Sequence, residues 1–232
     1  MLNRWKKKVT IFLLMIFCLN NSTVVFANAN TNFDFLQTAG YEQSFIYEEN
    51  GHNFECFFKE TSNGFDGIVY KLENGEKIFY DQFCITSDNN GNVWIDGVLF
   101  VEAEQENIED EIMPLELYPY QYHHGKINHS SGMTIASVAL GIYTAIAKVN
   151  PAISVAITVF TPIATVIVEK KFSSTYYQVR SQLETFPTNV PPEYSGAVTK
   201  IDYQYTIYKS TDLTSQNQIG STVYDVYYGM GY

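Results

Sequence analysis

Three histidines near the middle of the chain are candidate metal ligands, because imidazole is the commonest metal-binding side chain. His123, His124 and His129 lie close together, and the nearest acidic residue before them is Glu116. Their spacing matches no zinc motif. The chain also contains no Gly-rich phosphate loop, no Gly-x-Ser-x-Gly and no His-Glu-x-x-His. We therefore predict a surface histidine cluster, no metal or cofactor, and no enzymatic activity.

Two cysteines, Cys56 and Cys84, are candidates for a disulfide. Each lies in a short aromatic segment with the pattern of a β-strand. An oxidising compartment outside the cytosol would allow a bridge between them. The alternative is two buried thiols, since the sequence does not show whether the two Cα atoms lie within reach.

The first 29 residues have the organisation of an export signal. Arg4 and the lysines at 6–8 give a basic start, residues 9–19 are almost entirely apolar, and Ala27–Ala29 offers small residues for cleavage. The alternative is an uncleaved membrane anchor, but the apolar run is short for a ~30 Å hydrocarbon core. We therefore expect a secreted, extracellular protein.

Charge divides the remaining chain into two parts. Residues 30–113 carry 18 Asp and Glu against 3 Lys, whereas residues 114–232 carry 7 acidic and 7 basic residues. An acidic balance argues against nucleic acid as a partner, because Lys and Arg supply that affinity. Residues 30–101 are predicted to form an acidic β domain, a meander whose turns are marked by Asn-Gly and Asp-Gly pairs. Residues 102–130 are predicted to be an acidic linker.

Residues 131–171 are predicted to form an apolar helical hairpin. Lys148 is the only charged residue of its apolar part, and Asn150-Pro151 divides it into residues 134–149 and 152–168. Each half, if helical, spans roughly 24–26 Å, which suffices for a membrane span where the bilayer thins. The predicted membrane-inserting face comprises Ile135, Val138, Ile142, Ile146, Val149, Val155, Val159, Phe160, Ile163 and Ile167. The predicted helix-packing stripe comprises Ser137, Gly141, Thr144, Ser154, Thr158, Thr161 and Thr165.

Two alternatives remain open for this apolar segment. Residues 153–159 also alternate with period two, which is the pattern of a membrane β-hairpin. The other alternative is a hairpin buried in the core of the protein. This alternative requires a large apolar surface elsewhere in the protein to cover the hairpin, and residues 170–232 offer little apolar surface.

Residues 172–232 are predicted to form a Tyr-rich antiparallel β region. Tyrosines on sheets usually pack across neighbouring strands, and the alternative is an amphipathic face at a membrane interface or against sugars. The candidate interface aromatics are Tyr203, Tyr205, Tyr208, Tyr224, Tyr227 and Tyr228. The complete prediction is an α+β fold with an N-terminal antiparallel β-meander, a central apolar helical hairpin and a C-terminal Tyr-rich antiparallel β-sheet.

The order of these features resembles that of the large secreted bacteriocins of the geobacillin type from Gram-positive bacteria. The matching parts are Met1–Ala29, Ser131–Lys171 and Tyr203–Tyr228, about half of the chain. The last part contains a run of Tyr203, Tyr205, Tyr208 and Lys209. The chain departs from the family in being acidic, with few lysines in its tail. The resemblance implies an antibacterial role directed at membranes.

The expected function is that of a secreted antibacterial protein whose apolar hairpin inserts into target-cell membranes. The expected partners are the lipid membrane of the target bacterium and further copies of the chain. One alternative is a binding or immunity-type protein that the hairpin anchors at the cell surface. Another is a soluble secreted protein in which the hairpin forms the core.

Overall fold

The computed structural model describes residues 40–41, 43–104, 120–185 and 197–229. These residues belong to one compact unit. The predicted export signal, residues 1–29, lies outside the described residues, as does the middle of the predicted acidic linker, residues 105–119.

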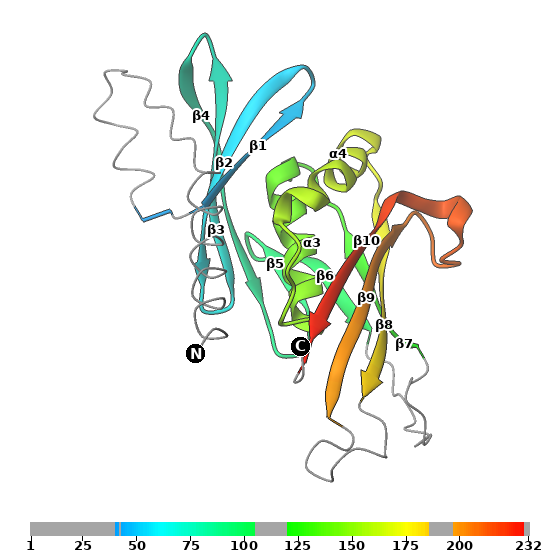
Figure 1. Ribbon diagram of the computed structural model, residues 1–232. Helices are drawn as coiled ribbons and strands as arrows, with labels where there is room; N and C mark the ends of the chain where they lie inside the picture. The colour runs from blue at the N-terminus through cyan, green and yellow to red at the C-terminus, as the bar shows by residue number, and fades with distance from the viewer. Residues whose placement is uncertain (1–39, 42, 105–119, 186–196, 230–232) are drawn as a thin grey trace, which may run out of the picture. The chain divides into compact units, whose positions relative to one another are not determined.

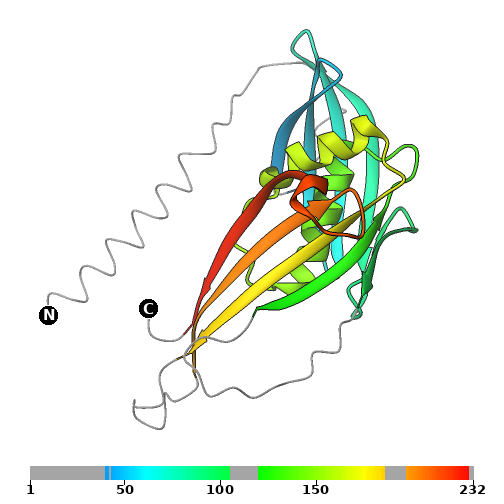
Figure 2. The ribbon, with the colours of Figure 1, turned by 90° about the vertical axis from the view of Figure 1, so that its right-hand side faces the viewer.

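Ten strands of the described chain form one antiparallel sheet, in which each strand pairs with its neighbour in the sequence (Figures 1 and 2). The first six are β1 (Gln43–Glu49), β2 (His52–Thr61), β3 (Gly64–Glu73), β4 (Glu76–Ser87), β5 (Val93–Ile95) and β6 (Val98–Glu104). The other four are β7 (Gln121–Asn128), β8 (Ser174–Thr185), β9 (Val198–Tyr208) and β10 (Gln218–Tyr228). Between β7 and β8 lie α3 (Ile135–Val149), the 3-10 helix η1 (Ile157–Phe160) and α4 (Thr161–Lys170), and the 3-10 helix η2 (Ser215–Asn217) precedes β10.

Two-residue turns build much of the meander, as the Asn-Gly and Asp-Gly pairs predict. Asn50-Gly51, Asn74-Gly75 and Asp96-Gly97 each join consecutive strands, and all six residues have positive φ angles. Two consecutive positive φ angles give a turn whose twist matches that of the flanking strands. These turns fix the pairing register of β1 with β2, β3 with β4, and β5 with β6.

One face of the sheet and the two α-helices share a single apolar core. Side chains alternate along the strands, so that Phe45, Phe58 and Ile85 point to the buried face. Helix α3 contacts β1, β3, β4, β5 and β6, and α4 contacts β10. Figure 1 shows the sheet curving around α3, with β1–β4 on one side and β7–β10 on the other. Figure 2 shows the long strands β7–β10 running side by side past the helices.

Local signals set the ends of α3. Thr134 caps its start, because the Thr134 hydroxyl accepts from the backbone N–H of Ser137 and the Ser137 hydroxyl accepts from that of Thr134. Lys148 lies in the last turn, where a positive charge favours the negative end of the helix. The helix ends before Asn150-Pro151, since proline cannot continue it.

The predicted α+β arrangement, with a central helical hairpin between two separate β regions, is wrong. Residues following Pro151 do not form a second long helix: Ala156 has extended backbone angles, and α4 begins only at Thr161, with Pro162 in its first turn. The flanking regions are not separate either. Strand β7, just before the helices, pairs with β6 on one side and with β8, just after the helices, on the other. The chain therefore forms one continuous sheet that carries two short helices on its inner face.

Candidate functional site

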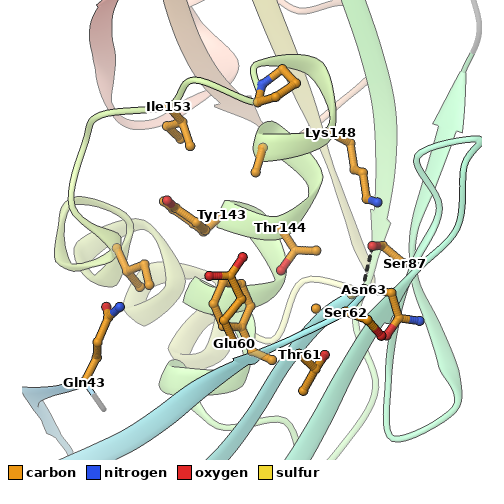
Figure 3. A pocket seen from close by; sticks show the side chains of 15 residues that line it. Gln43, Glu60, Thr61, Ser62, Asn63, Ser87, Tyr143, Thr144, Lys148 and Ile153 are labelled. Carbon is orange, nitrogen blue, oxygen red and sulfur yellow. Dashed lines mark hydrogen bonds between the residues drawn. The ribbon is translucent and has the colours of Figure 1, made fainter.

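A cleft of about 430 Å³ lies between α3 and the turn that joins β2 to β3 (Figure 3). Residues 60–65 form one side of the cleft, and α3 contributes Tyr143, Thr144 and Lys148 to the other. The loop after α3 adds Ile153 and Ile157. Such a volume falls within the range of small-molecule sites, ~300–1,000 Å³.

Internal hydrogen bonds hold part of the cleft lining in place. The Ser87 hydroxyl and backbone N–H donate to the carbonyl oxygen of Asn63, at 2.7 and 2.8 Å, and so fix the β2–β3 turn against β4. The Thr144 hydroxyl donates to the Leu140 carbonyl within α3, at 2.8 Å. The side-chain amides of Gln43 and Asn63 also line the cleft and form no hydrogen bond to another described residue.

Two opposite charges face the cleft without pairing with each other. Glu60 from β2 and Lys148 from α3 are both exposed, and neither forms an ion pair among the residues that the structure describes. Figure 3 shows Glu60 near Tyr143 and Lys148 near Ser87, with Thr144 between them in this view. A carboxylate and an ammonium group that point into one cleft can bind the two ends of a zwitterion.

Tyr143 supplies a neutral phenol to the same space. Its side chain is half-buried, and its ring packs edge-on against Phe65 and Phe160 at centroid distances of 6.0 and 6.3 Å. Burial raises the pKa of the Tyr143 phenol, and the negative charges of Glu60 and Asp225 raise it further. The phenol therefore keeps its proton at neutral pH and remains a hydrogen-bond donor.

A buried carboxylate secures the loop that borders the cleft. Asp225 of β10 is only 5% exposed, and its Oδ2 accepts from the Asn150 amide at 3.0 Å and from the backbone N–H of Ser154 at 3.0 Å. The Tyr205 hydroxyl lies 3.2 Å from the same oxygen, and the Ser154 hydroxyl bonds to Oδ1. These bonds attach the loop after α3 to β10, and the loop in turn positions Ile153 and Ile157.

Most of the predicted membrane-inserting residues lie in the protein core. Seven are buried with exposures of 3% or less: Ile135, Val138, Ile142, Ile146, Phe160, Ile163 and Ile167. Val149 and Val155 are partly buried against the core, and Val159 is 41% exposed. Within the described ranges, no helix is both long and apolar enough to cross a membrane.

The predicted helix-packing residues have several different roles. Ser137 belongs to the cap of α3, and Gly141 faces β6, where a Cβ atom would overlap the Phe100 ring. Thr144 lines the cleft, Ser154 bonds to Asp225, and Thr158 is exposed. The two remaining residues, Thr161 and Thr165, are linked within α4 by the bond from the Thr165 hydroxyl to the Thr161 carbonyl. The structure therefore does not bring the seven residues into one seam.

The predicted Cys56–Cys84 disulfide does not form in the structure. Both cysteines are free; Cys56 is buried and Cys84 is exposed. Cys56 pairs with Val69 and Cys84 pairs with Asp66, so strand β3 lies between them. Strands lie ≈ 4.7–4.9 Å apart, and the two side chains point to opposite faces of the sheet, so the sulfur atoms are out of reach of each other.

The six tyrosines predicted to form an interface divide between the two faces of the sheet. Tyr205 is fully buried and Tyr203 stacks beside it at a centroid distance of 6.2 Å. Tyr208 is also buried. The exposed ones are Tyr224, Tyr227 and Tyr228 on the edge strand β10.

The three predicted cluster histidines are divided between β7 and the segment that follows it. His123 and His124 lie on β7, whereas His129 follows that strand and turns toward the core, with its Nε2 3.0 Å from the Thr175 hydroxyl. Among the residues described, no three His, Cys, Asp or Glu side chains could hold a metal ion together.

No family model, curated protein or solved structure gives a significant match to the chain. The cleft residues Glu60 and Tyr143 were not singled out in the sequence, because neither carries a motif. Lys148 did carry a signal: it is the one charged residue in an otherwise apolar stretch.

Proposed function

We propose that the protein is an exported binding protein whose cleft takes a small zwitterion of the amino-acid type. The observation that carries the proposal is the placement of Glu60 and Lys148 on opposite sides of one cleft, without a mutual ion pair. Lys148 would receive the ligand's carboxylate, and Glu60 its ammonium group. Tyr143 and the free amides of Gln43 and Asn63 would supply further hydrogen bonds. Export rests on the signal pattern of residues 1–29 alone.

The membrane-disrupting and membrane-anchored roles stay predictions. Both need aliphatic residues that can face lipid, but Ile142 and its neighbours on α3 already pack against the sheet. Insertion would therefore require the core to open first, and the apolar area lost there would have to be regained in the bilayer. The binding proposal needs no such rearrangement, which is why we prefer it.

The proposal is tested by calorimetric titration of the full chain with a panel of free amino acids. For any amino acid that binds, the N-acetylated form lacks the ammonium group and the carboxamide form lacks the carboxylate. We expect each modified form to bind at least tenfold more weakly than the free amino acid. Absence of binding across the panel, or equal binding of all three forms, would contradict the proposal.

Two variants assign the two ends of the ligand. Glu60→Gln should remove the preference for a free ammonium group, and Lys148→Met should remove the preference for a free carboxylate. Glu76→Gln and Lys209→Met are matched controls, since both residues are exposed and lie outside the cleft. The controls should bind like the unchanged protein; a similar loss in all four variants would show that the cleft is not the site.

A further inference from the structure

A second cavity, of about 450 Å³, lies at the opposite end of α3 from the cleft. It is enclosed by the segment between β7 and α3, by the start of α3, and by the end of α4 with the residues that follow it. It shares no lining residue with the cleft.

The interior of this cavity is mostly apolar. Met133, Val168 and Phe172 supply accessible apolar surface and pack partly buried against the core to which Val138 and Ile167 belong. Water gains few hydrogen bonds from such walls, so an aliphatic chain would displace it favourably.

One buried polar atom in the lining lacks a partner. His129 bonds to the Thr175 hydroxyl through Nε2, at 3.0 Å, while its Nδ1 is buried and has no hydrogen-bond partner. Burial lowers the pKa of His129 to about 4, so the ring is neutral at neutral pH. When the Thr175 hydroxyl donates to Nε2, the proton of the neutral ring lies on Nδ1, which is then an unused donor. This nitrogen is itself buried, so a ligand in the cavity does not reach it, and His129 contributes an uncharged part of the wall.

A positive charge lies at the same cavity. Lys171, the left-handed residue that ends α4, is exposed and forms no ion pair within the described part of the chain. The hydroxyl residues Ser130, Ser131 and Ser173 also line the cavity. The accessible polar groups around an apolar interior are therefore a cation and hydroxyls, a set that complements an anion.

We propose that this cavity binds a medium-chain fatty acid. The alkyl chain would lie against Met133, Val168 and Phe172, and the carboxylate would pair with the Lys171 ammonium group and accept from serine hydroxyls of the lining. The proposal commits to a free acid, because the walls are apolar on the scale of one short chain and the polar groups complement a single carboxylate. It does not depend on amino-acid binding at the cleft.

The test is calorimetric titration of the full chain with decanoate, decanol and decyltrimethylammonium, each kept below its micelle concentration. We expect decanoate to bind at least tenfold more tightly than the alcohol and the cation to bind weakest. A parallel titration with phosphatidylglycerol vesicles distinguishes binding of a free acid from binding to a lipid surface. Equal binding of the three amphiphiles, binding of vesicles but not of decanoate, or no binding would overturn the proposal.

Three variants locate the binding site. Lys171→Asn removes the cation while keeping a residue that tolerates the left-handed conformation. It should weaken decanoate binding at least tenfold without changing decanol binding. Val168→Phe enlarges a side chain that lines the cavity, so it should weaken the binding of both decanoate and decanol. Lys170→Asn is the control, since this exposed neighbour does not line the cavity. Unchanged decanoate affinity in Lys171→Asn, or an equal loss in Lys170→Asn, would refute the assignment.

Discussion

At the scale of single residues, Asp225 connects three parts of the molecule. Its carboxylate is buried and accepts from the Asn150 amide, the Ser154 backbone and side chain, and the Tyr205 hydroxyl. A buried charge is tolerated when several donors replace the water that it has lost. Asp225 therefore holds the chain that follows α3 against β10.

Replacing Asp225 with Ala should cost about 3 kcal/mol of unfolding free energy, because four donors lose their acceptor and two of them belong to the buried residues Asn150 and Tyr205. Urea denaturation measures this cost. Asp212→Ala is the matched control: Asp212 also accepts several side-chain hydrogen bonds but is exposed, so its loss should stay below about 1 kcal/mol. Equal losses in the two variants would show that the Asp225 network does not hold the fold together.

His129 should make stability depend on pH in a defined window. Burial lowers its pKa from 6.5 to about 4, so between these values the unfolded chain binds a proton that the folded chain does not. Stability is therefore fully present above pH 6.5 and falls as the pH drops toward 4, by on the order of 2–3 kcal/mol. Denaturation of the protein and of His129→Phe between pH 8 and pH 4 checks this. The difference between the two should change across the window and be flat above it; a constant difference would contradict the expectation.

At the scale of elements, the sequence predicts what is decided locally. The Asn-Gly turns and helix 134–149 could be recognised because their signals, positive φ angles and a cap followed by an apolar periodicity, lie within a few residues. The structure of the second half of the apolar segment, residues 152–168, could not be recognised in this way. Its β-branched residues suit a strand and a helix almost equally, and the choice is made by the bonds of Ser154 to Asp225, 71 positions away. The cleft escaped prediction for the same reason, since Glu60 and Lys148 line one cleft only once α3 packs against the sheet.

Helix α3 provides the clearest test of whether its aliphatic face belongs to the core or to a membrane. Ile142 is 1% exposed, so Ile142→Asp would bury an unpaired charge at a cost comparable to the whole stability of a domain, ~5–15 kcal/mol. We expect this variant to be unfolded by circular dichroism. Val159→Asp places the same charge at a 41% exposed position of the same segment and should change stability by less than about 1 kcal/mol. A folded Ile142→Asp protein in solution would instead support a face that is free to meet lipid.

At the scale of the whole molecule, the acidic half supplies the partner surface that the apolar segment needs. From the sequence, residues 170–232 have too little apolar surface to cover residues 131–171. The structure shows that the inner faces of the N-terminal strands supply that surface. Phe45, Ile95 and Phe100 of β1, β5 and β6 belong to the same core as α3. Glu48 of β1 and Glu102 and Glu104 of β6 are exposed, so the acidic composition of this half conceals an apolar face.

This arrangement predicts that the two halves of the sheet unfold together. Helix α3 packs mainly on β1 and β3–β6, whereas α4 packs on β10, so the two contacting helices join the halves through one core. Separate β domains would instead melt independently. Trp5 and Trp94 are the only tryptophans, and Trp94 lies on β5, so a Trp5→Phe variant makes fluorescence a probe of the N-terminal half. The near-ultraviolet circular dichroism of the tyrosines mainly reports the C-terminal half. In urea the two probes should give coincident transitions with one midpoint; two separated midpoints would show that the sheet, although continuous, does not share one cooperative core.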